Sequence, residues 1–335
     1  MHFYWKVLSR ITAKRCFNAL LVLGSYYFSR LFKTQPIGFP ISLSIEPTTS
    51  CNLGCPECPS GLKQFSRPTG NLKSEQLYNW LNPIVDQLWY VNFYFQGEPF
   101  IHKEILSQIA FVSKQGVFTS TSTNAHFITK EIAENIIASG LDQLIISIDG
   151  TTQETYEKYR IHGKLEKVLE GTANIIEAKR NLQSSTPHVV FQFLVVAHNE
   201  HQIEDAKQLA KEYDVNEIRF KTAQVYNYEN GNDLIPKNDK YSRYKQLKSG
   251  KWVVKNKLEN HCWRMWSGSV ITWDGKVVPC CFDKDAKHQL GDLTVSSFRS
   301  IWKSTSYMQF RKKVMSNRSQ IDICTNCTEG TQVWS

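Results

Sequence analysis

Residues 51–58 read Cys51-Asn-Leu-Gly-Cys55-Pro-Glu-Cys58, and they follow an apolar run that ends at Ile45. Three thiolates at this C-x₃-C-x₂-C spacing can ligate three irons of a cubane [4Fe–4S] cluster and leave the fourth iron without a protein ligand. An open coordination position is typical of a catalytic metal centre. The alternative is a zinc site with a fourth ligand from elsewhere, such as His102 or His126. The spacing favours the iron–sulfur cluster.

Strand-like and helical patterns alternate on the carboxyl side of this loop. The predicted strands cover 41–45, 90–95, 117–121, 143–148, 189–196 and 217–221, and the predicted helices cover 74–88, 103–114, 129–139, 165–181 and 202–213. Six strands separated by helices indicate βα units and a parallel sheet, closed or partly closed as a barrel. Ligand sites in such folds lie at the carboxyl ends of the strands. The sequence therefore predicts an α/β fold with its site at that edge.

A second group of cysteines lies in the last quarter of the chain. Cys262 and Cys280 precede the pair Cys324-Thr-Asn-Cys327, which gives four thiolate ligands for an iron–sulfur cluster or for a zinc ribbon. Asp274-Gly275 predicts a hairpin between 270–272 and 276–278, and a helix is expected over 297–315. A module this small usually needs a metal to stabilise it. Cys281 is expected to point away from the site of Cys280, although the two thiols are candidates to exchange roles.

The composition narrows the class of protein. The chain has 335 residues with 41% apolar side chains, which excludes disorder, collagen and coiled coil as dominant states. Nine cysteines in tight groups are a poor disulfide framework and a better metal-ligand pattern for a reducing compartment. Of the net charge of +9, six charges belong to residues 1–45, which contain no acidic side chain. The remaining body is therefore not a basic surface built for nucleic acid.

The amino-terminal segment 1–36 predicts a basic amphipathic helical arm. Lys6, Arg10 and Lys14 share one helix face, and Phe3, Val7 and Ile11 share another. An uncharged run follows between Arg15 and Arg30, about 21 Å long as a helix, which is short for a bilayer core of about 30 Å. No clear signal-cleavage site follows. The arm is expected either to associate with a membrane surface through residues 1–35 or to pack on the catalytic domain or a partner. Cys16 is expected to be buried or lipid-facing.

The cysteine loop, its place after the first strand and the repeating βα body resemble the radical S-adenosylmethionine (SAM) superfamily. The resemblance implies a partial (β/α)6 barrel over 37–222 and an appended module over 262–335. The polar composition of 223–261, between them, predicts a linker or a bridging segment. The resemblance also implies that the [4Fe–4S] cluster on Cys51, Cys55 and Cys58 binds SAM. Reductive cleavage of SAM then gives a 5′-deoxyadenosyl radical that abstracts hydrogen from a substrate.

Residues at consecutive strand ends match motifs that bind SAM in this family. The resemblance implies SAM contacts from Gln96-Gly97-Glu98-Pro99, from Asn124 after Thr123, from Ser147 and Asp149 in Ser-Ile-Asp-Gly, and from Arg160 and Gln192. Glu98 is expected at the SAM amino group, Ser147 and Gln192 at the ribose, and Arg160 at the carboxylate, which a planar guanidinium suits. Two residues depart from the family pattern. Gln96 replaces a glycine, and Glu57 replaces the usual aromatic residue before the third cysteine, which leaves the packing beside adenine undetermined.

The carboxyl-terminal module resembles the twitch form of the SPASM domain, an auxiliary iron–sulfur module of radical SAM enzymes. No cysteine follows Cys327, so one auxiliary [4Fe–4S] cluster is expected, on Cys262, Cys280, Cys324 and Cys327. The spacing is similar to that of twitch-bearing dehydrogenases. In those enzymes a substrate carbon radical is oxidised to a ketone and the auxiliary cluster takes the electron. Full thiolate ligation suits such an acceptor, because it leaves no iron free for substrate.

The leading hypothesis is a radical SAM oxidoreductase with two [4Fe–4S] clusters, acting on an alcohol of a sugar-like or lipid-linked metabolite. One alternative is a peptide-modifying maturase, although the first 40 residues show no separate leader-binding domain. Another is a non-catalytic, zinc-stabilised binding module.

The expected partners are the substrate and a flavodoxin- or ferredoxin-type reductase, and nucleic acid is not an expected partner. The expected location is the cytoplasm, with any attachment at the inner membrane face. Tyr94, His126 and Lys221 are candidate cavity residues by their position at strand ends.

Overall fold

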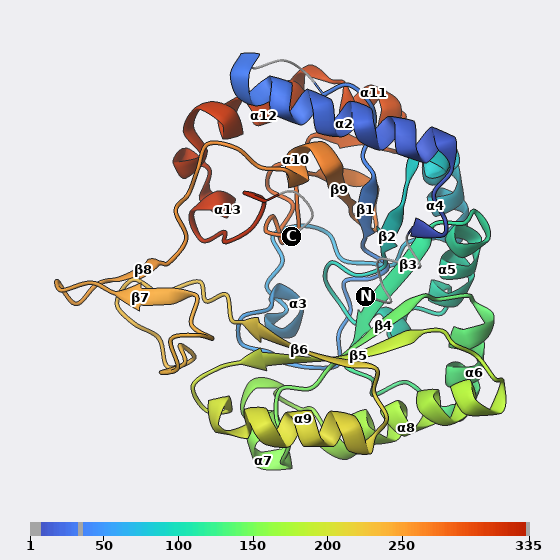
Figure 1. Cartoon of the computed structure of the whole chain (residues 1–335), viewed down its shortest axis with the longest axis vertical. Helices are drawn as coiled ribbons and strands as arrows, with labels where there is room; N and C mark the ends of the chain where they lie inside the picture. The colour runs from blue at the N-terminus through green and yellow to red at the C-terminus, as the bar shows by residue number, and fades with distance from the viewer. Residues whose placement is uncertain (1–7, 33–35, 333–335) are drawn as a thin grey trace.

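A single nine-stranded sheet organises the computed structural model, which describes residues 8–32 and 36–332 (Figure 1). Six of its strands are parallel and pair in sequence order. They are β1 (Ser42–Ile45), β2 (Tyr90–Asn92), β3 (Phe118–Thr123), β4 (Gln143–Ser147), β5 (His188–Val195) and β6 (Glu217–Thr222). Each predicted strand overlaps one of these, and the predicted partial α/β barrel is confirmed.

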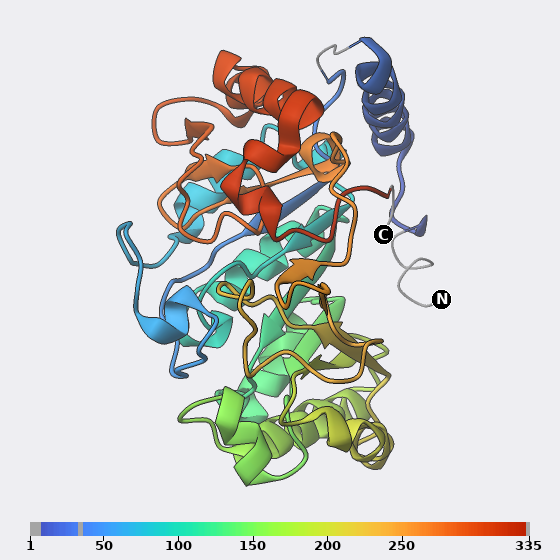
Figure 2. The same cartoon turned by 90° about the vertical axis from the view of Figure 1, so that its left-hand side faces the viewer.

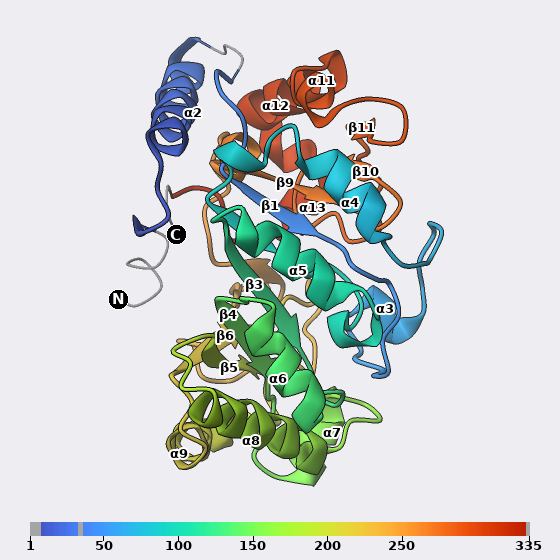
Figure 3. The same ribbon diagram turned by 90° about the vertical axis from the view of Figure 1, so that its right-hand side faces the viewer.

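The connections between these strands are helical, as parallel pairing requires. Figure 3 shows helices α4 (Ser74–Leu81), α5 (Ile105–Lys114), α6 (Lys130–Ala138) and α8 (Leu165–Asn181) along one face of the sheet. The other connecting elements are α3 (Pro59–Leu62), η1 (Val85–Gln87), η2 (Pro99–Ile101), α7 (Gln153–Tyr159), η3 (Glu200–Gln202) and α9 (Ile203–Glu212). All five residues of β4 are buried, which is why its sequence is a continuous apolar run instead of an alternating one.

The carboxyl-terminal residues extend the same sheet past β1. Strand β9 (Gly268–Ile271) pairs with β1 in parallel, and β10 (Lys276–Val278) and β11 (Gly291–Asp292) continue antiparallel. The predicted hairpin is present, and its turn runs from Thr272 to Gly275, whose φ of +86° favours glycine. The barrel and the module therefore share one hydrogen-bonded sheet, which the sequence analysis did not foresee.

Short helices complete the module and surround its cysteines. They are α10 (Arg264–Ser267), α11 (Phe298–Trp302), α12 (Thr305–Asn317), η4 (Arg318–Gln320) and α13 (Asp322–Thr325). The prediction of one helix over 297–315 is wrong, because the chain breaks after Trp302 and restarts at α12. Ser304 caps that second helix, with its hydroxyl accepting a hydrogen bond from the Tyr307 amide at 3.3 Å.

The amino-terminal helix α2 (Ala13–Phe32) lies across the outside of the barrel, next to α10 and η1 (Figures 1 and 2). Two arginines fix the start of this segment to the amino-terminal ends of the strands. Arg10 forms a bidentate ion pair with the buried Asp142, at 2.5 and 2.6 Å, and Arg15 donates to the carbonyls of Gln115 and Gly116. Within the described residues, the helices lack the combination of length and apolarity needed to cross a membrane.

The contacts of α2 with the barrel change the interpretation of the amino-terminal arm. Lys6, Phe3 and Val7 lie outside the described residues. Arg10 and Lys14, which were expected to share a free basic face, contact Asp142 and Asp86 of the barrel. Cys16 is exposed. Of the two expectations for this segment, the packing of α2 on the catalytic domain is the one that the contacts show.

Candidate active site

The cysteine loop follows β1 and is fixed by backbone contacts from three sides. The Gly54 amide donates to the Ile161 carbonyl at 2.9 Å, the Glu98 amide donates to Ser50 at 2.7 Å, and the Cys58 amide donates back to Cys55 at 3.3 Å. Cys55 is buried, and Cys51 and Cys58 are half-buried. Burial raises the pKa of Cys51 to about 12, and the neighbouring Glu98, Cys55 and Cys58 add to the effect. The loop thus concentrates three thiols in a desolvated position.

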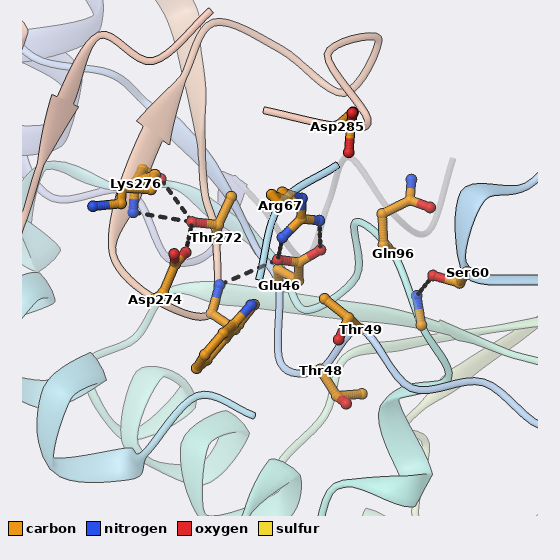
Figure 4. A network of polar contacts seen from close by, with 12 residues as sticks. Glu46, Thr48, Thr49, Ser60, Arg67, Gln96, Thr272, Asp274, Lys276 and Asp285 are labelled. Atoms are coloured by element: carbon orange, nitrogen blue, oxygen red, sulfur yellow. Dashed lines mark hydrogen bonds and ion pairs between the residues drawn. The ribbon is translucent and has the colours of Figure 1, made fainter. Parts of the chain in front are cut away.

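The predicted Gln-Gly-Glu-Pro motif packs against this loop. Gly97 has a φ of +76°, and a Cβ there would lie 2.3 Å from the Thr48 carbonyl oxygen, so the position needs glycine. Its amide donates to the Ser60 hydroxyl at 2.8 Å, a contact that Figure 4 shows beside Gln96. The Gln96 amide oxygen lies 3.8 Å from the Cys58 thiol. Pro99 begins η2. The motif therefore lies against the cysteine loop.

Glu98 ties the ends of β2 and β3 together. Its carboxylate accepts from the Thr123 hydroxyl at 2.6 Å and from the amides of Asn124 and Phe100 at 2.7 and 3.2 Å. Burial raises the pKa of Glu98, and these donors act in the opposite direction. Asn124 in turn donates to Asn52 of the cysteine loop at 2.7 Å. Glu98 thus positions the loop in this structure, in addition to its predicted role at the SAM amino group.

Arg160 and Asp149 form a buried ion pair next to the second cysteine. The Arg160 Nε lies 2.5 Å from Asp149, and its Nη1 lies 3.7 Å from the Cys55 sulfur. The other Asp149 oxygen accepts from the Leu194 amide at 2.7 Å, so this carboxylate connects the ends of β4 and β5. Burial lowers the pKa of Arg160, but Asp149 and Cys55 outweigh that effect and raise it. The guanidinium therefore stays charged beside the cluster thiols.

Ser147 and Gln192 are partners in register on β4 and β5. Ser147 is the last residue of β4, and Gln192 lies within β5. The other seven residues predicted to contact SAM follow β2, β3 or β4 along the chain, and four of them, Gln96, Glu98, Asn124 and Arg160, contact the cysteine loop.

The three candidate cavity residues differ in their surroundings. Both ring nitrogens of His126 have hydrogen-bond partners. Nδ1 lies 2.9 Å from the Asn124 carbonyl, and Nε2 accepts from the Lys164 amide at 2.9 Å. Lys221 is exposed. Burial raises the pKa of Tyr94, and the neighbouring Tyr90 and Cys281 add to the effect. Tyr94 is therefore a protonated hydrogen-bond donor at neutral pH, and it is close enough to the module to be affected by Cys281.

The module gathers the four predicted auxiliary thiols around a buried arginine. Cys262 and Cys324 are buried, and Cys280 and Cys327 are half-buried. Arg318 is 1% exposed and donates to the Cys327 sulfur at 3.3 Å and to the carbonyls of His261 and Glu329 at 2.8 and 2.9 Å. Burial lowers the pKa of Arg318, but Cys262 and Cys327 outweigh that effect and raise it. A permanent positive charge therefore faces this group of thiols.

The two neighbouring thiols of the module, Cys280 and Cys281, differ in part in the groups around them. Burial raises the pKa of both thiols. The neighbours that raise the pKa of Cys280 further are Cys281, Cys262 and Cys327. Arg264 lowers the pKa of Cys281, and Glu329 and Cys327 raise it. Two predicted ligands, Cys262 and Cys327, thus act on Cys280, and Arg264 is the neighbour that acts most on Cys281.

Both groups of thiols fit iron–sulfur clusters in their chemistry. Each combines buried or half-buried cysteines with a fixed arginine that can balance thiolate charge, namely Arg160 and Arg318. Among residues 8–32 and 36–332, no three His, Cys, Asp or Glu side chains converge as ligands of one metal ion do. A cubane cluster distributes its thiolates over several irons. The Cys51 group would supply three ligands, and the Cys262 group would supply four.

The segment 223–261 contacts both cysteine groups and is more than a linker. It contains the hairpin of β7 (Tyr244–Gln246) and β8 (Trp252–Val254). The Tyr226 amide donates to Glu57 of the first loop at 3.0 Å. The Tyr244 hydroxyl donates to the Asn326 side chain, between Cys324 and Cys327, at 2.9 Å. Glu57, where the family has an aromatic residue, thus binds the bridging segment. Its polar composition did not indicate which residues it would contact.

Comparisons with known proteins agree with this geometry. The family model described as the radical SAM superfamily matches residues 45–216, and that of an iron–sulfur cluster-binding domain, SPASM, matches residues 262–328. An AdoMet-dependent heme synthase of Methanosarcina barkeri is 27% identical over 159 residues, which cover 44% of this chain and 45% of that protein. The mycofactocin maturase MftC of Mycobacterium ulcerans is 28% identical over 175 residues, which cover 52% of this chain and 45% of that protein. The chain thus matches slightly less than half the length of these relatives.

Solved structures share the fold at low sequence identity. SuiB of Streptococcus suis bound to S-adenosylmethionine has a TM-score of 0.62 and 14% identity, with 82% of this chain and 68% of that chain covered. BtrN in complex with AdoMet and 2-DOIA has a TM-score of 0.54 and 16% identity, with 87% of this chain and 94% of that chain covered. The match over half of the chain assigns a [4Fe–4S] cluster and SAM to the barrel, and the second match assigns iron–sulfur binding to the module. The chain therefore belongs to the radical SAM superfamily and carries a SPASM-type iron–sulfur module at its carboxyl end.

Proposed function

We propose that this enzyme removes two electrons and two protons from an alcohol carbon of its substrate and forms a ketone. The observation that carries the proposal is the grouping of four thiols, Cys262, Cys280, Cys324 and Cys327, with the buried cation Arg318, in a module separate from the SAM-site loop. With four thiolate ligands, an auxiliary cluster has no iron free for substrate and is suited to electron transfer. Arg318 favours the reduced, more negative state of such a cluster.

In the proposed reaction the alcohol loses one hydrogen atom, and then one proton and one electron. Cys51, Cys55 and Cys58 would hold the first cluster, which together with SAM would supply a radical able to take the hydrogen atom of the H–C–OH group. The resulting carbon radical would lose its hydroxyl proton to water or a base, and its unpaired electron to the cluster that Cys262, Cys280, Cys324 and Cys327 would hold. Glu98, Asp149 and Arg160 position the SAM loop through their hydrogen bonds and ion pair. A flavodoxin- or ferredoxin-type reductase in the cytoplasm would supply the electron for SAM cleavage.

Cluster content and SAM cleavage test this proposal first. Anaerobically reconstituted enzyme should contain about eight irons and eight sulfides per chain if two [4Fe–4S] clusters are present. It should release 5′-deoxyadenosine when it is reduced with SAM. Stoichiometric zinc, with neither iron nor cleavage, would contradict the assignment.

Two cysteine variants separate the roles of the sites. Cys55→Ala should lose the first cluster and SAM cleavage, because only two thiolates remain to hold it. Cys324→Ala should keep SAM cleavage and lose substrate oxidation, because the electron acceptor is removed. Normal ketone formation by Cys324→Ala would rule out the acceptor role.

A peptide substrate is the second candidate, and the relatives favour it. One of them is named as a mycofactocin maturase, and SuiB has also been solved bound to its precursor peptide SuiA, with a TM-score of 0.62. Transfer of deuterium from labelled candidates into 5′-deoxyadenosine would decide the question. Label from a sugar-like alcohol supports dehydrogenation of a small molecule, and label from a peptide Cα or side chain supports a maturase.

A further inference from the structure

Helix α2 packs with its polar side inward. The residues it buries against the rest of the protein are Arg15, Asn18, Ala19, Val22, Ser25, Tyr26 and Ser29. Asn18 exchanges two hydrogen bonds with the backbone of Phe39 at 2.9 Å, and the Tyr26 hydroxyl bonds His261 at 2.8 Å. A helix on the surface of a soluble domain ordinarily buries its apolar side. Helix α2 therefore turns mostly polar side chains toward the protein, which is the reverse of the usual arrangement.

The outward side of α2 is a continuous apolar stripe. Phe17, Leu20, Tyr27, Phe28, Leu31 and Phe32 are each at least half exposed, at 64, 62, 50, 59, 76 and 63%. Their spacing of three, four and seven residues keeps them on one side of the helix, and Gly24 leaves no bulk between them. We call these six apolar residues the α2 stripe.

The contacts that hold α2 in place do not involve the α2 stripe. Arg15, Asn18 and Tyr26 make the polar contacts to the barrel and the module, and Val22 makes the apolar ones. Figures 2 and 3 show α2 at the edge of the molecule, with no other described element over its outer side. Large contiguous apolar patches are rare on soluble monomers and mark sites of association. Since no element within residues 8–32 and 36–332 covers it, the α2 stripe is available to contact something outside this part of the chain.

Positive side chains border the α2 stripe. Arg30 lies near the carboxyl end of α2 and is exposed, whereas Lys14, near the other end, is paired with Asp86. Arg299 and Lys303 lie over the Phe39 ring, at 4.6 and 5.1 Å from its centroid, beside the helix. The nearby carboxylates, Asp86 and Glu259, are already paired with Lys14 and His261. An uncharged apolar stripe with a cationic border complements an anionic lipid surface, whereas in a symmetric dimer two such borders would face each other.

We propose that the α2 stripe lies in the surface of a membrane that contains anionic phospholipid, with the helix axis parallel to the membrane plane. Phe17, Leu20, Phe28 and Leu31 enter the boundary between headgroups and acyl chains, and Arg30 contacts lipid phosphates. The polar side of α2 remains bound to the barrel, so the enzyme is held at the surface as a folded unit. This inference does not depend on the reaction proposed above.

Vesicle flotation with the full reconstituted chain tests the proposal. Wild-type enzyme should float with vesicles of phosphatidylglycerol and phosphatidylcholine, and should float less with phosphatidylcholine alone. Leu20→Glu/Phe28→Glu should lower the partition constant at least tenfold, because two apolar side chains that would enter the lipid become charged. Leu247→Glu is the matched control, an exposed leucine on the β7–β8 hairpin that should leave partition within about twofold of wild type.

Iron content and melting temperature should be equal in all three proteins, because none of these side chains is buried. The proposal is overturned if wild-type enzyme stays at the bottom of the gradient with both vesicles, or if the double variant floats as well as wild type. It is also overturned if wild type is a dimer that does not float and Leu20→Glu/Phe28→Glu makes it monomeric. That last result would assign the α2 stripe to a second copy of the chain.

Discussion

At the scale of single residues, Arg318 is the side chain with most influence on the auxiliary site. Its guanidinium is buried, and it reaches the Cys327 sulfur and two carbonyls that belong to the cysteine-bearing loops. Hydrogen bonds and positive charge near cluster sulfurs stabilise the reduced state and raise the reduction potential. The same residue therefore holds the loops together and adjusts the potential of the proposed electron acceptor.

Replacing Arg318 should make the auxiliary cluster harder to reduce. We expect Arg318→Gln to lower its midpoint potential by roughly 60 mV, which corresponds to about 1.4 kcal/mol for a one-electron couple. Arg318→Lys, which keeps the charge, should shift it less. Potentiometric titration followed by electron paramagnetic resonance measures both. An intact cluster with the wild-type potential in Arg318→Gln would disprove this role.

His126 gives the site a dependence on pH. Burial lowers its pKa from the ordinary 6.5, and Arg160 and Lys167 lower it further. Below about pH 6.5 the unfolded chain binds a proton that the folded chain rejects, so the free energy of unfolding falls as the solution is acidified. We expect wild type to lose more melting temperature between about pH 7 and pH 5.5 than His126→Gln does, since that variant cannot titrate. Parallel losses in the two proteins would show that His126 does not contribute.

At the scale of elements, the sequence predicts the helices, strands and loops that depend on residues close together along the chain. The six parallel strands and the cysteine loop were predictable, because buried strands are apolar runs and the ligands of each group are mostly close in sequence. The pairing of β9 with β1 was not, since residues over 200 positions apart meet there and neither strand encodes its neighbour. The bonds of Glu57 to Tyr226 and of Tyr244 to Asn326 were missed for the same reason.

The break between α11 and α12 depends on a serine that helical periodicity ignores. Ser304 accepts from the Tyr307 amide, and α12 then buries Tyr307 and stacks Arg311 on the Trp302 ring at 4.1 Å. Removing such an N-cap lowers stability by about 1 kcal/mol. Ser304→Ala should therefore lower the free energy of unfolding by that amount in chemical denaturation. Ser249→Ala, in an exposed turn, is the control and should have no measurable effect. Equal effects of the two substitutions would contradict the capping role.

At the scale of the whole molecule, one buried ion pair joins the barrel to the module. Glu46, at the end of β1, is fully buried, and its carboxylate accepts two hydrogen bonds from Arg67, at 2.5 and 2.9 Å (Figure 4). It also accepts from the Trp273 amide of the β9–β10 turn at 3.2 Å. Burial raises the pKa of Glu46, and Arg67 opposes that rise. The charge on Glu46 therefore depends on a residue of the loop that follows the SAM-site cysteines.

Breaking this pair should destabilise both parts of the molecule together. Arg67→Met leaves a buried carboxylate without its partner, which costs about 3–5 kcal/mol. Adding Glu46→Gln should recover part of that loss, because the neutral amide no longer needs a counter-charge. Arg180→Met is the matched control, since its pair with Asp214 is exposed and is worth at most about 1 kcal/mol. Because β1 and β9 belong to one sheet, far-ultraviolet circular dichroism and iron–sulfur absorbance should be lost in one transition, at lower denaturant in Arg67→Met. Loss of absorbance well before the helical signal would mean that the module unfolds independently and that Glu46 does not couple the two parts.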